Sequence, residues 1–148
     1  MLPVTEGSVR LFLHIVAATV WIGGQFTLGA LVSTVREGGP DLVRSVARRF
    51  QLLAWPAFAV LVATGIWNVL DAHLGDQGSE YVTTLVVKLV FVGFSGLAAA
   101  LHTFVAAPAV ARAPSEDRAR GARAWSGILG AGSLTFALAA AFLGVLLA

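Results

Sequence analysis

Two residues that could carry chemistry, His14 and Lys88, stand inside long apolar runs of the sequence. His14 interrupts LFLHIVAATVWIGGQF, residues 11–26, and Lys88 interrupts YVTTLVVKLVFVGFSGLAAALH, residues 81–102. A polar or ionisable side chain inside hydrocarbon loses hydration that only a partner can replace. We therefore expect each side chain to have a partner: a metal, a cofactor or a group on a neighbouring helix.

The composition of the 148-residue chain is that of a membrane protein. Hydrophobic residues make up 57% and charged residues 12%, and the mean hydropathy is +0.83. Because one crossing needs about 20 residues, we predict an all-α, integral membrane four-helix bundle that forms a single domain over residues 1–148. Charges, glycines and prolines delimit four predicted spans, at about residues 9–35, 51–72, 81–107 and 121–147. The formal charge of +2 and the placement of arginines in short loops exclude nucleic acid as a partner.

The arginines also predict how the chain lies in the lipid bilayer. They gather in the first and third connections (Arg36, Arg44, Arg48 and Arg49; Arg112, Arg118, Arg120 and Arg123), whereas the middle connection, residues 71–80, has no Lys or Arg. By the positive-inside rule, both chain ends then lie on the periplasmic side of a cell inner membrane. For residues 42–50 two interpretations stay open: a short interfacial helix near the lipid headgroups, or a helical extension of the second span.

Polar residues form two stripes on the predicted helices. At 100° per residue, His14, Trp21 and Gln25 share one face of the first span. Lys88, Ser95 and His102 share one face of the third. Because these two spans run parallel, His14 and Lys88 should reach a similar depth in the outer leaflet, which indicates a polar or cofactor-filled interior.

This pattern favours a haem b site in the outer leaflet. His14 would supply a nitrogen to iron, and Arg10, one turn earlier, would join Lys88 as a cation for the propionates. Trp21 and Trp67 would add flat aromatic walls.

The second axial ligand of such a haem stays open. Its candidates are Lys88, once neutral, His73 in the middle connection and His102 in the inner leaflet. For His73 we favour an exposed loop position, because acidic residues flank it. For His102 we favour a hydrogen bond to a neighbouring helix.

Three segments, in this order, resemble a known family: LHIVAATVWIGGQF, WPAFAVLVATGIWNVL and the run from Tyr81 to His102. Together they resemble the copper resistance protein D (CopD) family and are similar to HemJ-type protoporphyrinogen oxidases, over nearly the whole chain. The HemJ resemblance implies haem b, held with a histidine matching His14 and a lysine matching Lys88, and oxidation of protoporphyrinogen to protoporphyrin. The CopD resemblance implies copper uptake or tolerance.

Ligand chemistry favours haem among these alternatives. The chain has no cysteine and a single methionine, Met1, whereas Cu(I) pathways use thiolate and thioether ligands. His14, His73 and His102 are too scattered to form one copper site. We therefore expect a haem b redox protein that passes electrons to a quinone or a respiratory partner, with a porphyrin as a candidate substrate. Copper transport or tolerance is the first alternative, and a structural membrane bundle without cofactor is the second. Enzymatic activity, catalytic residues and homo-oligomerisation stay open.

Overall fold

The computed structural model describes residues 3–147, apart from the side chain of Leu74, and these residues form helices joined by short turns. The elements are α1 (Glu6–Glu37), α2 (Gly39–Asp71), the 3₁₀ turn η1 (Leu74–Asp76), α3 (Ser79–Leu101), the π-helical turn η2 (His102–Ala106), α4 (Ala107–Ala111) and α5 (Glu116–Leu146). Within residues 3–147 there is no strand. Four helical stretches are long and apolar enough to cross a membrane: Glu6–Glu37, Gly39–Asp71, Ser79–Ala111 and Glu116–Leu146. The prediction of an all-α protein with four spans is confirmed.

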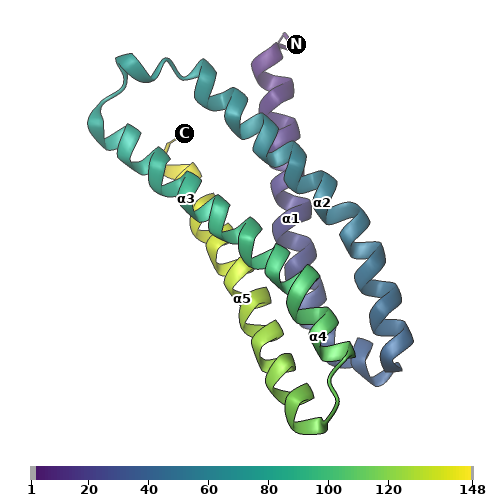
Figure 1. The fold of residues 1–148 in the computed structure, drawn as a ribbon. Helices are drawn as coiled ribbons and strands as arrows, with labels where there is room; N and C mark the ends of the chain where they lie inside the picture. The colour runs from purple at the N-terminus through teal and green to yellow at the C-terminus, as the bar shows by residue number, and fades with distance from the viewer. Residues whose placement is uncertain (1–2, 148) are drawn as a thin grey trace. The chain divides into compact units, whose positions relative to one another are not determined.

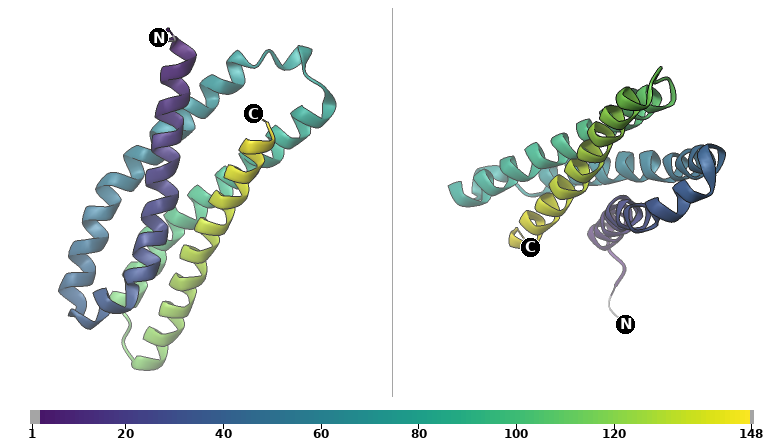
Figure 2. Two further views of the ribbon diagram at one scale, coloured as in Figure 1. Left: turned by 180° about the vertical axis from the view of Figure 1, so that it is seen from behind. Right: turned by 90° about the horizontal axis from the view of Figure 1, so that it is seen from below.

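The helices form two compact units, here called hairpin 1 (Met1–Gln77) and hairpin 2 (Gly78–Ala148). In hairpin 1, α1 and α2 run antiparallel (Figure 1). In hairpin 2, α3 continues through η2 into α4, and this long helix runs antiparallel to α5 (Figure 2). The assembly of both hairpins into one four-helix bundle stays a prediction.

The turn of hairpin 1 is tighter than expected. Gly38 ends α1, Gly39 adopts a φ of +85° that favours glycine, and proline follows in the first turn of α2. Helix α2 therefore begins at Gly39. Residues 42–50 are a helical extension of the second span, as one of the two interpretations predicted, and a separate interfacial helix is wrong.

The long first helix of hairpin 2 contains an irregular turn. The π-helical turn His102–Ala106 directly precedes Ala107–Ala111, which carries a proline in its first turn. Pro108 has no N–H to donate to the carbonyl four residues earlier, and a local widening of the helix accommodates the missing bond. The chain then turns back into α5, where the side chain of Ser115 accepts a hydrogen bond from the backbone N–H of Arg118 at 3.4 Å.

Small residues occupy the buried positions, whereas large apolar residues face outward. Most buried apolar side chains are alanines, and the buried polar ones are Thr64, Ser95 and Ser133. Large side chains such as Phe12, Leu70 and Phe142 are more than 60% exposed. This distribution suits helices that pack closely through small residues while lipid surrounds them.

Candidate functional site

His14 is held by a residue of the neighbouring helix. Its Nδ1 lies 2.8 Å from Oγ1 of Thr64 in α2, and Thr64 is buried. The threonine hydroxyl itself donates to the carbonyl of Val60 at 2.7 Å. Because a hydroxyl has one proton, Thr64 then accepts from His14, and Nδ1 of the imidazole carries the proton. A metal bound by this tautomer would be bound through Nε2.

Arg10 lies one turn before His14 and is fixed by two residues of α2. Its Nη2 lies 2.5 Å from Oδ2 of Asp71, and its guanidinium carbon lies 5.7 Å from the centre of the Trp67 ring. The Arg10 side chain is only 13% exposed, and its Nε is buried without a hydrogen-bond partner among the described residues. The cation predicted for a propionate is therefore present beside Trp67, but Asp71 already pairs with it.

The two tryptophans predicted as cofactor walls have different surroundings. Trp21 is 3% exposed, and its ring centre lies 5.9 Å from that of Trp55 and 4.5 Å from that of Phe58, both in α2. It thus packs α1 against α2. Trp67 is 46% exposed and forms the aromatic partner of Arg10.

The stripe predicted on the third span lies against α5 in hairpin 2. Ser95 Oγ donates to the carbonyl oxygen of Ser133 at 2.9 Å, and His102 Nδ1 lies 2.9 Å from the carbonyl oxygen of Ser126. Since a carbonyl only accepts, Nδ1 of His102 carries the proton. The preference for a hydrogen bond between His102 and a neighbouring helix is confirmed.

Lys88 belongs to the same face of α3. Its Nζ would lie 2.9 Å from a Cβ built on Gly144 of α5, so the glycine leaves the room that the ammonium group occupies. Within residues 3–147 no carboxylate forms an ion pair with Lys88. His14 belongs to hairpin 1 and Lys88 to hairpin 2, so a haem site that includes both residues stays a prediction.

The remaining candidate ligand, His73, lies in the turn after α2. It is exposed, adopts a φ of 43°, and its Nδ1 donates to the carbonyl oxygen of Asp71 at 2.8 Å. The exposed loop position favoured for it is confirmed. No group of three or more His, Cys, Asp or Glu residues that could hold a metal is found among the described residues.

Thr64 and Asp71 are the contacts of His14 and Arg10 that the sequence-based reasoning did not assign. A signal was present, because the two residues are seven positions apart and so share one face of a helix. Both are polar positions near or within the apolar run of α2.

Comparison with known proteins adds a family to this geometry. The family model of copper resistance protein D (CopD) matches residues 44–147, more than two thirds of the chain. The chain belongs to the CopD family. No curated protein and no solved structure matches it.

The CopD match covers some candidate residues and not others. Thr64, Trp67, Lys88 and His102 lie inside the matched range, whereas α1, with His14, precedes it. The CopD match and the four candidate spans make this chain a multi-pass membrane protein. The resemblance to HemJ-type oxidases stays a prediction.

Proposed function

We propose that this CopD-family protein contributes to copper resistance from within the membrane, with copper as its substrate. The observation that carries the proposal is the family match over residues 44–147, which includes most of α2 and every long helix of hairpin 2. Copper tolerance, the first alternative of the sequence analysis, thereby becomes the leading function.

Imidazole would be the main copper ligand. The chain contains no cysteine and one methionine, so soft sulfur ligands are nearly absent and histidine nitrogen takes their place. His14 and His102 each have Nδ1 held by a neighbouring helix, which fixes the orientation of the ring for a ligand at Nε2. With no three-ligand group among residues 3–147, these histidines support brief contacts with copper rather than a tight storage site.

The proposal predicts a metal-specific effect in cells. A copper-sensitive bacterium that expresses the chain should grow at higher copper concentrations than the same strain with an empty vector, while its zinc tolerance stays unchanged. His14→Ala and His102→Ala should reduce this gain, because each removes an oriented imidazole. His73→Ala is the matched control, since His73 is exposed in a turn. Equal copper tolerance and equal cellular copper with and without the chain would refute the proposal.

A haem b redox function is the second candidate, and three side chains of hairpin 1 support it. His14, Arg10 and Trp67 provide an oriented imidazole, a mostly buried cation and an exposed aromatic ring, and haem needs little more from a protein. The imidazole of His14 fits haem as an iron ligand. Arg10 fits a propionate only if it is shared with Asp71.

In this candidate function, haem would supply one-electron chemistry when bound, with a quinone or respiratory partner as acceptor and a porphyrin as candidate substrate. His14 would hold the iron and Arg10 would balance a propionate charge. The visible spectrum of protein purified with added haem decides the matter. A Soret band that His14→Ala removes and His73→Ala keeps supports haem, and a spectrum identical to that of free haem refutes it.

We also propose on which side of the membrane the two chain ends lie. The arginines of the first and third connections support cytoplasmic placement of both, with both termini on the periplasmic side of the inner membrane. A reporter enzyme active only in the periplasm should be active when fused after residue 148 and inactive when fused at residue 114. The reverse pattern would overturn this orientation.

A further inference from the structure

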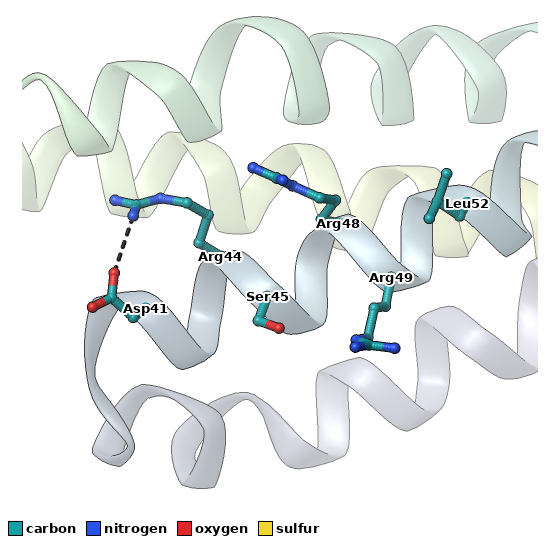
Figure 3. A pocket seen from close by; sticks show the side chains of 6 residues that line it. All are labelled: Asp41, Arg44, Ser45, Arg48, Arg49 and Leu52. Carbon is teal, nitrogen blue, oxygen red and sulfur yellow. Dashed lines mark hydrogen bonds and ion pairs between the residues drawn. The ribbon is translucent and has the colours of Figure 1, made fainter.

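Arginines line a depression on the surface of α2. It has a volume of about 540 Å³, and its lining consists of Asp41, Arg44, Ser45, Arg48, Arg49 and Leu52 (Figure 3). All six residues belong to the first half of α2. Arg44 and Arg48 project from the same side of the helix, one turn apart, and Arg49 projects from a different side (Figure 3).

The depression carries a net positive charge. Asp41 pairs with Arg44 through an Oδ1–Nη1 contact of 3.0 Å, and no carboxylate within residues 3–147 forms an ion pair with Arg48 or Arg49. At the start of α5, Arg120 pairs with Asp117 and Arg123 pairs with Glu116, while Arg118 forms no ion pair within residues 3–147. Arg48 and Arg49 at the depression therefore differ from Arg120 and Arg123, each of which has an acidic partner on its own helix.

The length of α2 places these groups at the edge of the hydrocarbon core. At 1.5 Å per residue, its 33 residues span about 50 Å, whereas the hydrocarbon core is about 30 Å thick. The apolar part of the helix, residues 50–70, is about long enough to cross that core. Arg48 and Arg49 then lie at the level of the headgroups. Leu52, which is 70% exposed, lies at the level of the first acyl carbons.

We propose that this depression binds the phosphate headgroup of an anionic phospholipid from the adjoining leaflet. The guanidinium group is planar and donates paired hydrogen bonds that match phosphate oxygens. Arg48 contacts the phosphate, Arg44 and Ser45 border the headgroup, Arg49 adds positive charge from the other side of the helix, and Leu52 contacts the acyl chain. A phospholipid, unlike free phosphate, satisfies both the charged and the apolar part of the lining. The site is separate from the histidines of the proposed function.

The test compares lipids of matched acyl chains on the full-length protein. Delipidated protein in neutral detergent is titrated with dioleoylphosphatidylglycerol or dioleoylphosphatidylcholine, and bound lipid is counted by native mass spectrometry. We expect tighter binding of phosphatidylglycerol, with an affinity that falls as salt is raised. Arg48→Gln with Arg49→Gln should weaken it roughly 25-fold, because each cation near an anionic surface contributes roughly fivefold.

The matched control removes two arginines that already have partners. Arg120→Gln with Arg123→Gln takes away the same charge and should leave phosphatidylglycerol binding within about twofold of the wild type. Equal binding of the two lipids, or equal losses in both double variants, overturns the proposal. Inorganic phosphate that competes as well as the lipid at equal concentration also overturns it, since the site would then select phosphate alone. If the Arg48 and Arg49 variant fails to fold, the salt dependence of wild-type binding decides: affinity for phosphatidylglycerol that does not change with salt refutes the site.

Discussion

Nδ1 of His14 lies 2.8 Å from Oγ1 of Thr64, and this contact joins α1 to α2 within an apolar hairpin. The Thr64 hydroxyl donates its hydrogen bond to the Val60 carbonyl, so His14 donates to Thr64 through Nδ1. His102 in hairpin 2 is held through the same nitrogen by the Ser126 carbonyl. In both hairpins the partner helix thus fixes the tautomer of a histidine inside a candidate span, which is how metal-binding histidines are usually oriented.

Replacing Thr64 by valine should loosen this arrangement. The side chain keeps its shape but loses the acceptor for His14, which leaves a partly buried N–H unpaired, so we expect a loss of about 1–2 kcal/mol in stability. Unfolding in detergent, followed by circular dichroism, measures the loss, and the ¹⁵N shifts of His14 report whether Nδ1 keeps its proton. Thr135→Val is the control, because the exposed Thr135 donates its hydrogen bond to the Ala131 carbonyl of its own helix. Equal stability of the two variants would show that the hydrogen bond to His14 contributes nothing.

The pair of Arg10 and Asp71 should show coupling in a double-mutant cycle. Arg10 is mostly buried, so Asp71→Asn leaves a cation without its counter-ion and should lower the melting temperature. Arg10→Gln should lower it too, and the double variant should lose less than the sum of the single losses. Asp76→Asn, on an exposed residue of η1, should have no effect. Strictly additive losses would contradict an energetic role for the pair.

The four spans could be predicted because apolar runs of this length rarely occur in proteins outside membrane-spanning helices. The ends of the helices could not be predicted in the same way. Hydropathy indicates where the chain leaves the hydrocarbon core, whereas each helix continues beyond that point. Residues 42–50 continue α2 because the glycine turn at Gly38 and Gly39 already reverses the chain. The third span continues past His102 as predicted, but through a π-helical turn, for which no periodic pattern in the sequence gives a signal.

The faces of the helices could be predicted, but their partners could not. A period of 100° per residue puts Ser95 and His102 on one face, and both contact α5. The acceptor of His102 is a backbone carbonyl, which every residue has, so no side-chain pattern could point to Ser126. Arg10 and Asp71 are 61 positions apart, and only the geometry of the hairpin turn brings them together.

The contacts of α3 with α5 predict two different outcomes for two serines. Ser95→Ala removes the donor to the Ser133 carbonyl, and Ser95 and Ser133 are each 1% exposed. We therefore expect this variant to lose about 0.5–1 kcal/mol of stability. Ser126→Ala should have almost no effect, because His102 keeps the backbone carbonyl as its acceptor. Thermal unfolding of both variants in one detergent measures the difference. A larger loss for Ser126→Ala would mean that its hydroxyl, 3.1 Å from His102 Nδ1, is the more important partner.

Two adjacent glycines of α1 should respond in opposite ways to alanine. A Cβ on Gly24 would lie 2.5 Å from Cε2 of the Phe50 ring, whereas a Cβ on Gly23 would meet no atom of the described structure within 4 Å. Gly24→Ala should therefore cost about 1–2 kcal/mol, because the Phe50 ring must move. Gly23→Ala should be neutral or stabilising by up to about 1 kcal/mol, since alanine favours helix. Melting temperatures of the two variants provide the test.

Phe50→Leu should recover part of the stability lost in Gly24→Ala, because leucine lacks the ring atoms that the new methyl group would meet. If Gly23→Ala is the more damaging variant, or if Phe50→Leu gives no recovery, the packing of Phe50 on α1 is not as described.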